Sequence, residues 1–221
     1  MKVLFIGNSY TFFSDLPELF RALAEKNGKD IEVSSVTKGG WSMIKYLDLG
    51  DENSEKLNEA LSKSPYDAVI LQDHSIMSIK TPELFADGMT RMKERLEGKA
   101  DRIILYQTWA RKAGHKTLSE NGWTREHMHQ VVTSAYRGMA AELGAEIALV
   151  GECFYCVSEA HPEIELYNSD GTHPSYEGSA FAAICHYRTM YGELPEDCSS
   201  LKLSVEMESV FKNAVKEIYK D

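Results

Sequence analysis

Short apolar runs alternate with helical patterns along the whole chain. The apolar runs occupy residues 3–6, 31–36, 68–71, 102–106 and 146–150. Each run is bounded by turn-forming or polar residues, as expected for strands that are buried on both faces of a parallel sheet. The pattern therefore predicts a sheet of parallel strands.

Helical spacing appears between these runs. Apolar stripes begin at Leu16, Phe85, Met128, Ala180 and Val210. All but the last are followed by a glycine, at positions 28, 98, 144 and 192, and glycine commonly ends a helix. The methionine and aromatic residues in these stripes are interpreted as core faces and not as cofactor contacts.

Strands that alternate with helices favour right-handed crossovers and a sheet covered on both faces. We therefore predict an α/β fold, a three-layer α/β/α sandwich around a five-stranded parallel sheet. No internal repeat, low-complexity tract or linker is present, which predicts a single domain over residues 1–221. Ligands bind beyond the carboxyl ends of such strands, so the loops of interest are residues 7–14, 37–42, 72–78, 107–122 and 151–174.

Composition narrows the partners and the compartment. The chain has 221 residues, 43% of them hydrophobic, and a net charge of −10. An acidic chain is a poor partner for nucleic acid or an anionic membrane, since both bind basic patches on a protein surface. No stretch approaches the ~18 apolar residues of a membrane span, and the apolar run at the N-terminus is too short for a signal peptide. We expect a cytoplasmic protein, unless a leader has been removed.

Cysteine and histidine positions give little support to redox or metal chemistry. Cys153 and Cys156 have the spacing of a redox motif, but no basic residue beside them favours a thiolate. His127 and His129 are two residues apart in a helical pattern and therefore face different directions. We expect reduced thiols, no metal and no cofactor.

Three residues at opposite ends of the sequence could form a nucleophilic site. Ser9 directly follows the first apolar run, but a serine hydroxyl is a weak nucleophile without a base. His173 can act as that base, because an imidazole titrates near ~6.5. Asp170, three residues earlier, can fold back onto the imidazole and fix its tautomer. Taken singly, Ser9 could be a turn residue, and the segment from Asp170 could be an Asp turn before a helix.

Further candidates follow the second and third apolar runs. Gly40 could bring its amide close to a substrate as an oxyanion donor, although a flexible turn also explains it. The side chain of Gln72 or of His74 could be another donor, and the amide of Ser9 could be a third. Asp73 could contact the substrate or form a local structural pair with His74.

Tryptophans lie on or beside the expected site loops. Trp41 and Trp109 could stack on a sugar face or line an acyl pocket, and plain packing explains them about as well. The segment from Trp109 to Trp123 is polar and long for a connection, as lids often are.

These motifs resemble those of the SGNH (GDSL-like) hydrolase family along nearly the whole chain. Ile6-Gly7-Asn8-Ser9 is similar to the family's first block, with Asn8 where Asp is commoner, and Gly40 is similar to the second-block glycine. Asp170-Gly171-Thr172-His173-Pro174 resembles the Asp-x-x-His-Pro block, which is the most specific match. The resemblance implies a flavodoxin-like fold with Ser9 as nucleophile, His173 as base and Asp170 as its orienting residue. It also implies oxyanion donors from the amides of Ser9 and Gly40.

The third block departs from the family pattern. The family usually has Gly-x-Asn-Asp after the third strand, and this chain has Leu71-Gln72-Asp73-His74-Ser75. Register places His74 at the position of the family's Asn, whereas chemistry favours the amide of Gln72. The third oxyanion donor therefore has two candidates, in what looks like a poorly characterised branch of the family.

The sequence as a whole predicts a serine esterase. We expect it to hydrolyse a short acyl ester, such as an O-acetyl group on a carbohydrate or other small molecule, through an acyl-enzyme on Ser9. One alternative is a non-catalytic module that binds a carbohydrate or an anion on the same fold. A weaker alternative is a flavodoxin-like redox module that uses Cys153 and Cys156.

Overall fold

The computed structural model describes residues 1–220 and contains a five-stranded parallel sheet in the order β2-β1-β3-β4-β5. Its strands are β1 (Lys2–Gly7), β2 (Glu32–Thr37), β3 (Tyr66–Leu71), β4 (Ala100–Tyr106) and β5 (Glu146–Ala148). Every strand predicted from the sequence is present. The last one is shorter than predicted, because Val150 already begins a helix.

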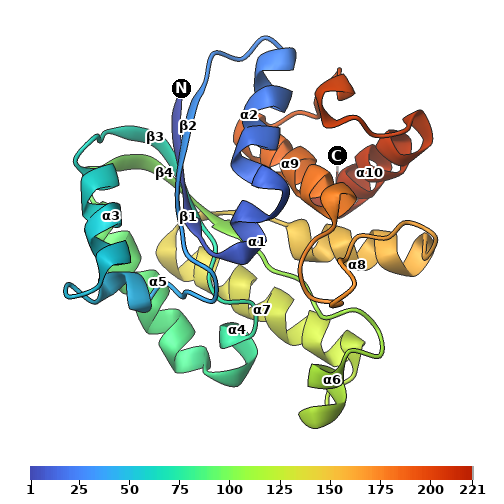
Figure 1. Ribbon diagram of the computed structural model, residues 1–221, viewed down its shortest axis with the longest axis horizontal. Helices are drawn as coiled ribbons and strands as arrows, with labels where there is room; N and C mark the ends of the chain where they lie inside the picture. The colour runs from blue at the N-terminus through green and yellow to red at the C-terminus, as the bar shows by residue number, and fades with distance from the viewer. Residues whose placement is uncertain (221) are drawn as a thin grey trace.

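Helices cover both faces of this sheet (Figure 1). One face carries α2 (Leu16–Lys26), α8 (Val150–Ala160), α9 (Tyr176–Tyr191) and α10 (Val205–Tyr219). The other carries α3 (Glu52–Leu61), α5 (Pro82–Leu96) and α7 (Arg125–Leu143). Side chains alternate along a strand, so Phe5 packs in the hydrophobic core on the first of these faces and Leu4 in the core on the second. This is the predicted three-layer α/β/α arrangement.

Short elements lie in the connections. They are α1 (Ser9–Phe12), η1 (Phe13–Asp15), η2 (Lys45–Leu47), α4 (Met77–Lys80), α6 (Lys116–Glu120) and η3 (Ser199–Leu201).

Helices α3 and α8 were not predicted. All of α8 except its first residue, Val150, lies within residues 151–174, a segment expected to be a loop. The first turns of α8 are rich in glycine, cysteine and aromatic residues, which are poor helix formers, and no side chain caps its start. In α3 the apolar face is narrow, with Leu57 and Leu61 as its buried apolar residues. Tertiary packing, and not local propensity, therefore stabilises both helices.

The strand order places a switch point between β1 and β3. From β1 the chain crosses to β2 on one side, and it then returns to add β3 on the other side. Ligands bind at such a point, beyond the carboxyl ends of the strands. Ser9 follows β1 there and Asp73 follows β3.

Side-chain hydrogen bonds tie the loops together at this edge. The Asn8 N–H donates to Gln72 Oε1 at 2.9 Å, and Asn8 Nδ2 donates to the carbonyl of Trp41 at 2.8 Å. A Cβ atom on Gly7 would come within 2.3 Å of Thr11 Oγ1 and 2.8 Å of Gln72 Oε1, so the close approach of Gln72 requires a glycine there. The loops after β1, β2 and β3 therefore form one connected unit.

Asp73 completes this connection from inside the protein. Its side chain is 0% exposed, and Oδ1 accepts hydrogen bonds from the N–H groups of Met43 at 2.8 Å and His74 at 2.7 Å. Within residues 1–220, Oδ2 has no partner. Burial raises the pKa of Asp73 to about 7, although the two N–H donors act to lower it. The structure gives Asp73 a structural position, and the expectation that it contacts substrate is corrected because its carboxyl group is fully buried.

Two further observations concern the chain as a whole. No helix between residues 1 and 220 is both long and apolar enough to cross a membrane. The cysteines are free thiols, with Cys153 buried in α8 and Cys156 partly buried one turn later.

We predict that Asp73→Asn stabilises the fold increasingly as the pH rises. The folded pKa of Asp73 lies above that of an exposed aspartate, so the folded state binds more protons between about pH 4 and 7 and the wild type loses stability as pH rises through that window. The amide is neutral throughout and its oxygen can still accept both N–H donors. Urea unfolding at pH 5 and pH 8 should show the difference between variant and wild type growing by on the order of 2 to 4 kcal/mol.

Asp101→Asn, at an exposed position on β4, is the matched control and should leave the pH dependence unchanged. Identical pH dependence in the wild type and Asp73→Asn would contradict a raised pKa for this buried carboxyl group.

Candidate active site

Ser9 is the first residue of α1, directly after β1. Asn8 caps this helix, since its Oδ1 accepts a hydrogen bond from the N–H of Tyr10 at 3.1 Å. The first N–H groups of a helix have no partner within the helix. The Ser9 amide is therefore available beside its own hydroxyl group.

Asp170 and His173 lie on one tight turn before α9. The N–H groups of Thr172 and His173 both donate to Asp170 Oδ1 at 2.9 Å, and Gly171 adopts the left-handed conformation that this turn needs, with φ of +64°. The sequence spacing predicts that the Asp170 carboxylate folds back onto the imidazole. The two N–H donors and the left-handed Gly171 explain how the turn achieves this.

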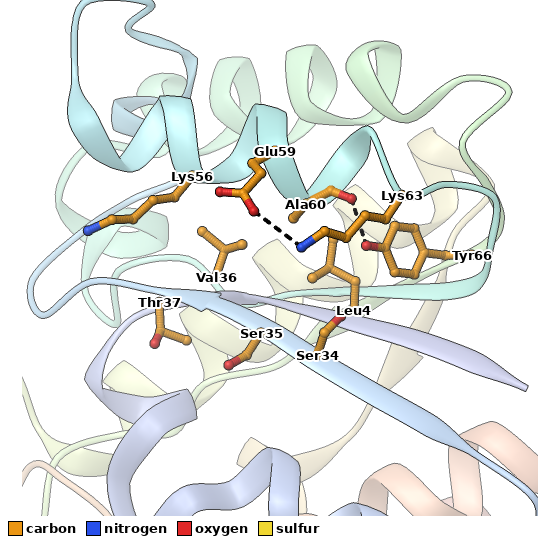
Figure 2. Close-up of a pocket in the computed structure, with 10 residues that line it drawn as sticks. All are labelled: Leu4, Ser34, Ser35, Val36, Thr37, Lys56, Glu59, Ala60, Lys63 and Tyr66. Atoms are coloured by element: carbon orange, nitrogen blue, oxygen red, sulfur yellow. Dashed lines mark hydrogen bonds and ion pairs between the residues drawn. The ribbon is translucent and has the colours of Figure 1, made fainter.

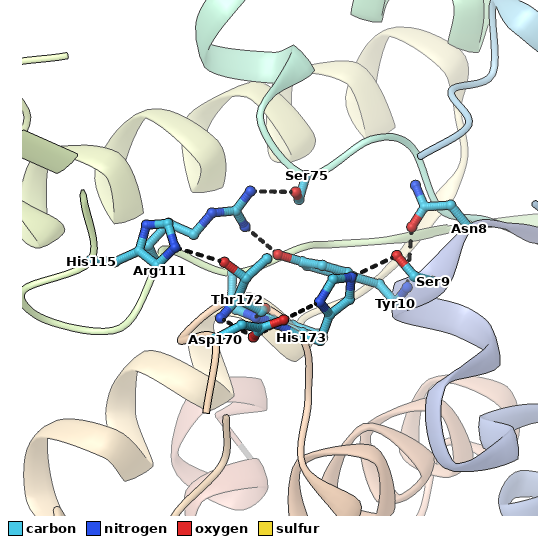
Figure 3. A network of polar contacts seen from close by, with 10 residues as sticks. Asn8, Ser9, Tyr10, Ser75, Arg111, His115, Asp170, Thr172 and His173 are labelled. Atoms are coloured by element: carbon cyan, nitrogen blue, oxygen red, sulfur yellow. Dashed lines mark hydrogen bonds and ion pairs between the residues drawn. The ribbon is translucent and has the colours of Figure 1, made fainter. Parts of the chain in front are cut away.

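The structure brings the three predicted residues together (Figure 3). His173 Nε2 lies 2.9 Å from Ser9 Oγ, although 164 positions separate the two residues in the sequence. His173 Nδ1 lies 2.5 Å from Asp170 Oδ2. Burial raises the pKa of Asp170, but hydrogen bonds from the His173 ring and the two N–H groups outweigh it and hold the pKa below its usual value. An ionised Asp170 accepts a hydrogen bond from Nδ1–H of His173, which leaves the Nε2 lone pair facing the serine hydroxyl.

Aromatic rings hold the imidazole of His173 from two sides. Phe13 stacks on it with ring centroids 4.4 Å apart, and Tyr10 meets it edge to face at 5.6 Å. Two left-handed residues follow Phe13 and lead the chain into α2, Ser14 with φ of 52° and Asp15 with φ of 53°. Phe13 and Tyr10 had no signal in the sequence, since neither belongs to an apolar stripe.

A second histidine braces the Asp170 turn from outside. His115 Nδ1 accepts the N–H of Thr117 at 3.1 Å, so Nε2 carries the proton and donates to Thr172 Oγ1 at 3.1 Å. The N–H of Lys112 donates to the carbonyl of Gly171 at 3.0 Å. The segment after β4, which looked like a lid in the sequence, therefore anchors the turn that carries the imidazole.

Gly40 retains the features expected of an oxyanion donor. It is exposed, its φ is +69°, and no acceptor within residues 1–220 bonds to its N–H. The next residue, Trp41, is hydrogen-bonded through its carbonyl to Asn8. Gly40 is therefore tied through its neighbour Trp41 to Asn8, the residue before Ser9.

The structure separates the two candidates for the third donor. Gln72 is fully buried, with Oε1 accepting from Asn8 and Thr11 and Nε2 donating to the carbonyl of Asp73. The expectation that its amide faces a substrate is thus corrected. His74 is only partly buried, and burial with the nearby charges of Arg111 and Lys45 lowers its pKa. A neutral His74 ring can donate one N–H, so His74 is the remaining side-chain candidate.

The tryptophans occupy different environments. Trp109 is 1% exposed, its ring lies between those of Tyr10 and Phe154, and its Nε1 donates to the carbonyl of Thr172 at 3.1 Å. The expectation that Trp109 binds substrate is therefore corrected, because neither face of its ring is free. Trp41 is partly buried, with the Lys45 ammonium 4.9 Å from the ring centroid, and it stays a candidate for substrate contact.

A polar network beside the triad was not predicted from the sequence. Arg111 donates from Nη1 to the hydroxyl of Tyr10 and from Nη2 to Ser75 Oγ at 2.9 Å (Figure 3). Nothing distinguishes Arg111 from the other cations of its loop in the sequence. Its importance appears only when the loops after β1, β3 and β4 meet.

The cavity of about 340 Å³ between β2 and α3 is not the site of this chemistry (Figure 2). Its walls carry Lys56, Glu59, Lys63 and Tyr66, and the Lys63 ammonium pairs with Glu59 at 3.3 Å. It contains no member of the triad. Across residues 1–220, no group of three potential metal-binding side chains is found.

Comparisons with known proteins place the fold. No family model and no curated protein matches the chain. Among solved structures, a candidate SGNH hydrolase from Slackia heliotrinireducens is 29% identical with a TM-score of 0.75, over 86% of this chain and 98% of that one. A DUF4886 family protein from Bacteroides uniformis is 18% identical with a TM-score of 0.75, over 100% of this chain and 96% of that one. Axe2, an acetylxylan esterase from Geobacillus stearothermophilus, is 15% identical with a TM-score of 0.63, over 87% and 94% of the two chains.

The sheet order, the helices on both faces and these structural matches agree with one another and with the motif order in the sequence. The chain therefore has the fold of the SGNH (GDSL-like) hydrolase family and is assigned to that fold family.

Proposed function

We propose that the chain is a serine esterase that hydrolyses short-chain esters through an acyl-enzyme on Ser9. The observation that carries the proposal is the continuous series of contacts from Ser9 Oγ to His173 Nε2 and from His173 Nδ1 to Asp170 Oδ2. Nucleophile, base and orienting carboxylate in this geometry are what acyl transfer to a hydroxyl group requires.

The first half of the reaction forms the acyl-enzyme. His173 Nε2 takes the proton of Ser9 as Oγ attacks the ester carbonyl, and Asp170 stabilises the imidazolium that results. The negative charge on the carbonyl oxygen is received by the amides of Ser9 and Gly40 and by an N–H of His74. His173 then protonates the departing alcohol.

The second half releases the acid. Water enters where the alcohol has left and attacks the acyl carbon while His173 takes its proton. The tetrahedral intermediate then collapses, the bond from the acyl carbon to Ser9 Oγ breaks, and His173 returns the proton to Ser9 Oγ. The reaction uses no cofactor. The stacked Phe13 ring keeps the imidazole in position during both proton transfers.

One observation supports a short acyl group, such as acetyl. Axe2, which shares the fold, is an acetylxylan esterase. A carbohydrate or other small molecule is the alcohol that we favour, with Trp41 as a stacking surface.

A second candidate function is a non-catalytic module that binds a carbohydrate or an anion. The altered third block favours it, because Gln72 is buried and only His74 can replace the family's asparagine. The two functions differ in whether Ser9 reacts.

We predict that Ser9→Ala abolishes both esterase activity and labelling by a fluorophosphonate probe. The probe bonds covalently to a serine oxygen that a neighbouring base activates, so the hydroxyl of Ser9 is essential for it. Activity should be measured against short aryl acetates and acetylated sugars, and kcat should fall at least about 1,000-fold. Ser119→Ala, at an exposed position of α6, serves as the control and should behave like the wild type.

If the folded wild type is neither labelled nor active on any of these esters, the binding module becomes the better function. Labelling that persists in Ser9→Ala would place the nucleophile elsewhere.

We predict that Asp170→Asn lowers kcat by about 10,000-fold while the protein stays folded. An amide at this position offers the imidazole a neutral partner, so the tautomer with the Nε2 lone pair toward Ser9 is no longer favoured. The measurement is kcat on an aryl acetate together with a circular dichroism spectrum. Asp101→Asn is a matched exposed control. Near-normal turnover by folded Asp170→Asn would remove Asp170 from the mechanism.

A further inference from the structure

Arg111 is a buried cation without an anionic partner. Its side chain comes from the loop after β4, and the residue is only 6% exposed. Its hydrogen bonds go to two hydroxyl groups, those of Tyr10 and Ser75, and its Nε atom has no partner in residues 1–220. Among residues 1–220, no carboxylate lies within 4 Å of the Arg111 guanidinium group.

Five other arginines pair with carboxylates, whereas the more exposed Arg95 donates to the carbonyl of Tyr46 and to Asn58 Oδ1. Carboxylates within 4 Å pair with Arg21, Arg91, Arg102, Arg125 and Arg137. Arg111 is also the one arginine or lysine that is buried among residues 1–220. The most buried cation is therefore one that the fold leaves without a counter-charge.

The groups in contact with Arg111 do not supply a negative charge, and Asp170, whose charge acts on Tyr10 and His115, lies more than 4 Å from its guanidinium group. Burial raises the pKa of Tyr10 even though Arg111 acts to lower it, so the phenol stays protonated at neutral pH. Burial and the charge of Arg111 lower the pKa of both His74 and His115, so their rings stay neutral. A buried charge without a partner is costly and is found where a ligand or a reaction supplies the partner.

The position of Arg111 relates it to the proposed catalytic residues. Tyr10, whose hydroxyl it contacts, directly follows Ser9, and the Tyr10 ring meets the His173 ring edge to face at 5.6 Å. Figure 3 shows the Tyr10 side chain reaching from beside Ser9 toward the guanidinium group of Arg111. Arg111 is thus linked through Tyr10 to His173, the residue that protonates the departing alcohol in the proposed reaction, and for this reason we assign it to the alcohol half of the substrate.

We propose that Arg111, with Ser75, forms a subsite for an anionic substituent, a carboxylate, on the alcohol half of the ester substrate. This inference rests on the proposed esterase function and narrows its substrate class to acidic alcohols. A guanidinium group has five N–H donors in a planar fork, and two are used here, so N–H donors remain for a carboxylate. Ser75 Oγ accepts from Arg111 and also hydrogen-bonds the Tyr10 side chain, so Ser75 holds the guanidinium group in place.

The first test uses two acetate esters that differ only in charge, 3-acetoxybenzoate and its neutral isostere 3-acetoxybenzamide, and repeats the comparison with the 4-substituted pair. Wild-type kcat/KM should favour the carboxylate at one spacing by about 10-fold or more. Arg111→Gln should bring the two values within about twofold of each other by lowering the carboxylate value alone. Arg111→Lys keeps the charge without the fork and should retain part of the preference.

A second test does not depend on turnover. Ser9→Ala protein is titrated by calorimetry with 3-hydroxybenzoate and with 3-hydroxybenzamide, and the 4-hydroxy pair is titrated in the same way. The carboxylates should bind more tightly than the amides, and the double variant Ser9→Ala, Arg111→Gln should lose that difference. Circular dichroism spectra establish that each variant is folded, and the wild-type and Arg111→Lys comparisons stand if Arg111→Gln is not.

The outcomes separate the two proposals. Carboxylate binding that depends on Arg111 in a protein that hydrolyses no ester keeps the subsite and overturns the esterase. Hydrolysis that ignores the carboxylate at both spacings, with no difference in calorimetric binding, overturns the subsite and leaves the esterase. An equal loss on charged and neutral esters in Arg111→Gln would also overturn the subsite, since it would show a structural role alone.

Discussion

The hydrogen bond between Ser9 and His173 is the contact on which the arrangement of the site depends. The two residues are 164 positions apart, and the bond closes at 2.9 Å because the loop after β1 and the turn before α9 reach the same sheet edge. Each partner is fixed separately. Asn8 caps the short helix that carries Ser9, while Asp170 and the ring of Phe13 hold the imidazole. A serine and a histidine held this way need no large movement before proton transfer, which is how pre-organised sites lower a barrier.

Loops from the first three strands share one set of buried polar groups. Asn8 and Gln72 join the loops after β1 and β3, and Asp73 joins the loop after β3 to that after β2. Such networks are costly when incomplete, because a buried polar atom without a partner loses its hydration. The position of Gly40 therefore depends on all three loops at this edge of the sheet, since its neighbour Trp41 is hydrogen-bonded to Asn8. A change in any of these loops should be felt in the others.

Most of the architecture could be read from hydrophobic spacing, because parallel strands and the helices on them leave regular patterns. The exceptions were α3 and α8, whose apolar faces are narrow or made of poor helix formers. The serine, histidine and aspartate were recognisable because a short motif carries each of them. Gln72 was misplaced, since a polar residue at a strand end gives no sign of whether it faces solvent or a neighbouring loop. Arg111 was not identified, because its importance depends on residues from other loops that surround it. No local sequence pattern shows that a cation lacks an acidic neighbour in the folded protein.

The side chain of Asn8 serves two loops at once. Its carbonyl oxygen caps a helix and its amide nitrogen donates to the backbone of the loop after β2. An aspartate, the commoner residue in the family that the chain resembles, can cap the helix but has no proton to offer that loop when it is ionised. The amide of Asn8 therefore couples the start of the helix that carries Ser9 to the loop that carries Gly40, and a carboxylate at position 8 would leave the carbonyl of Trp41 without this donor.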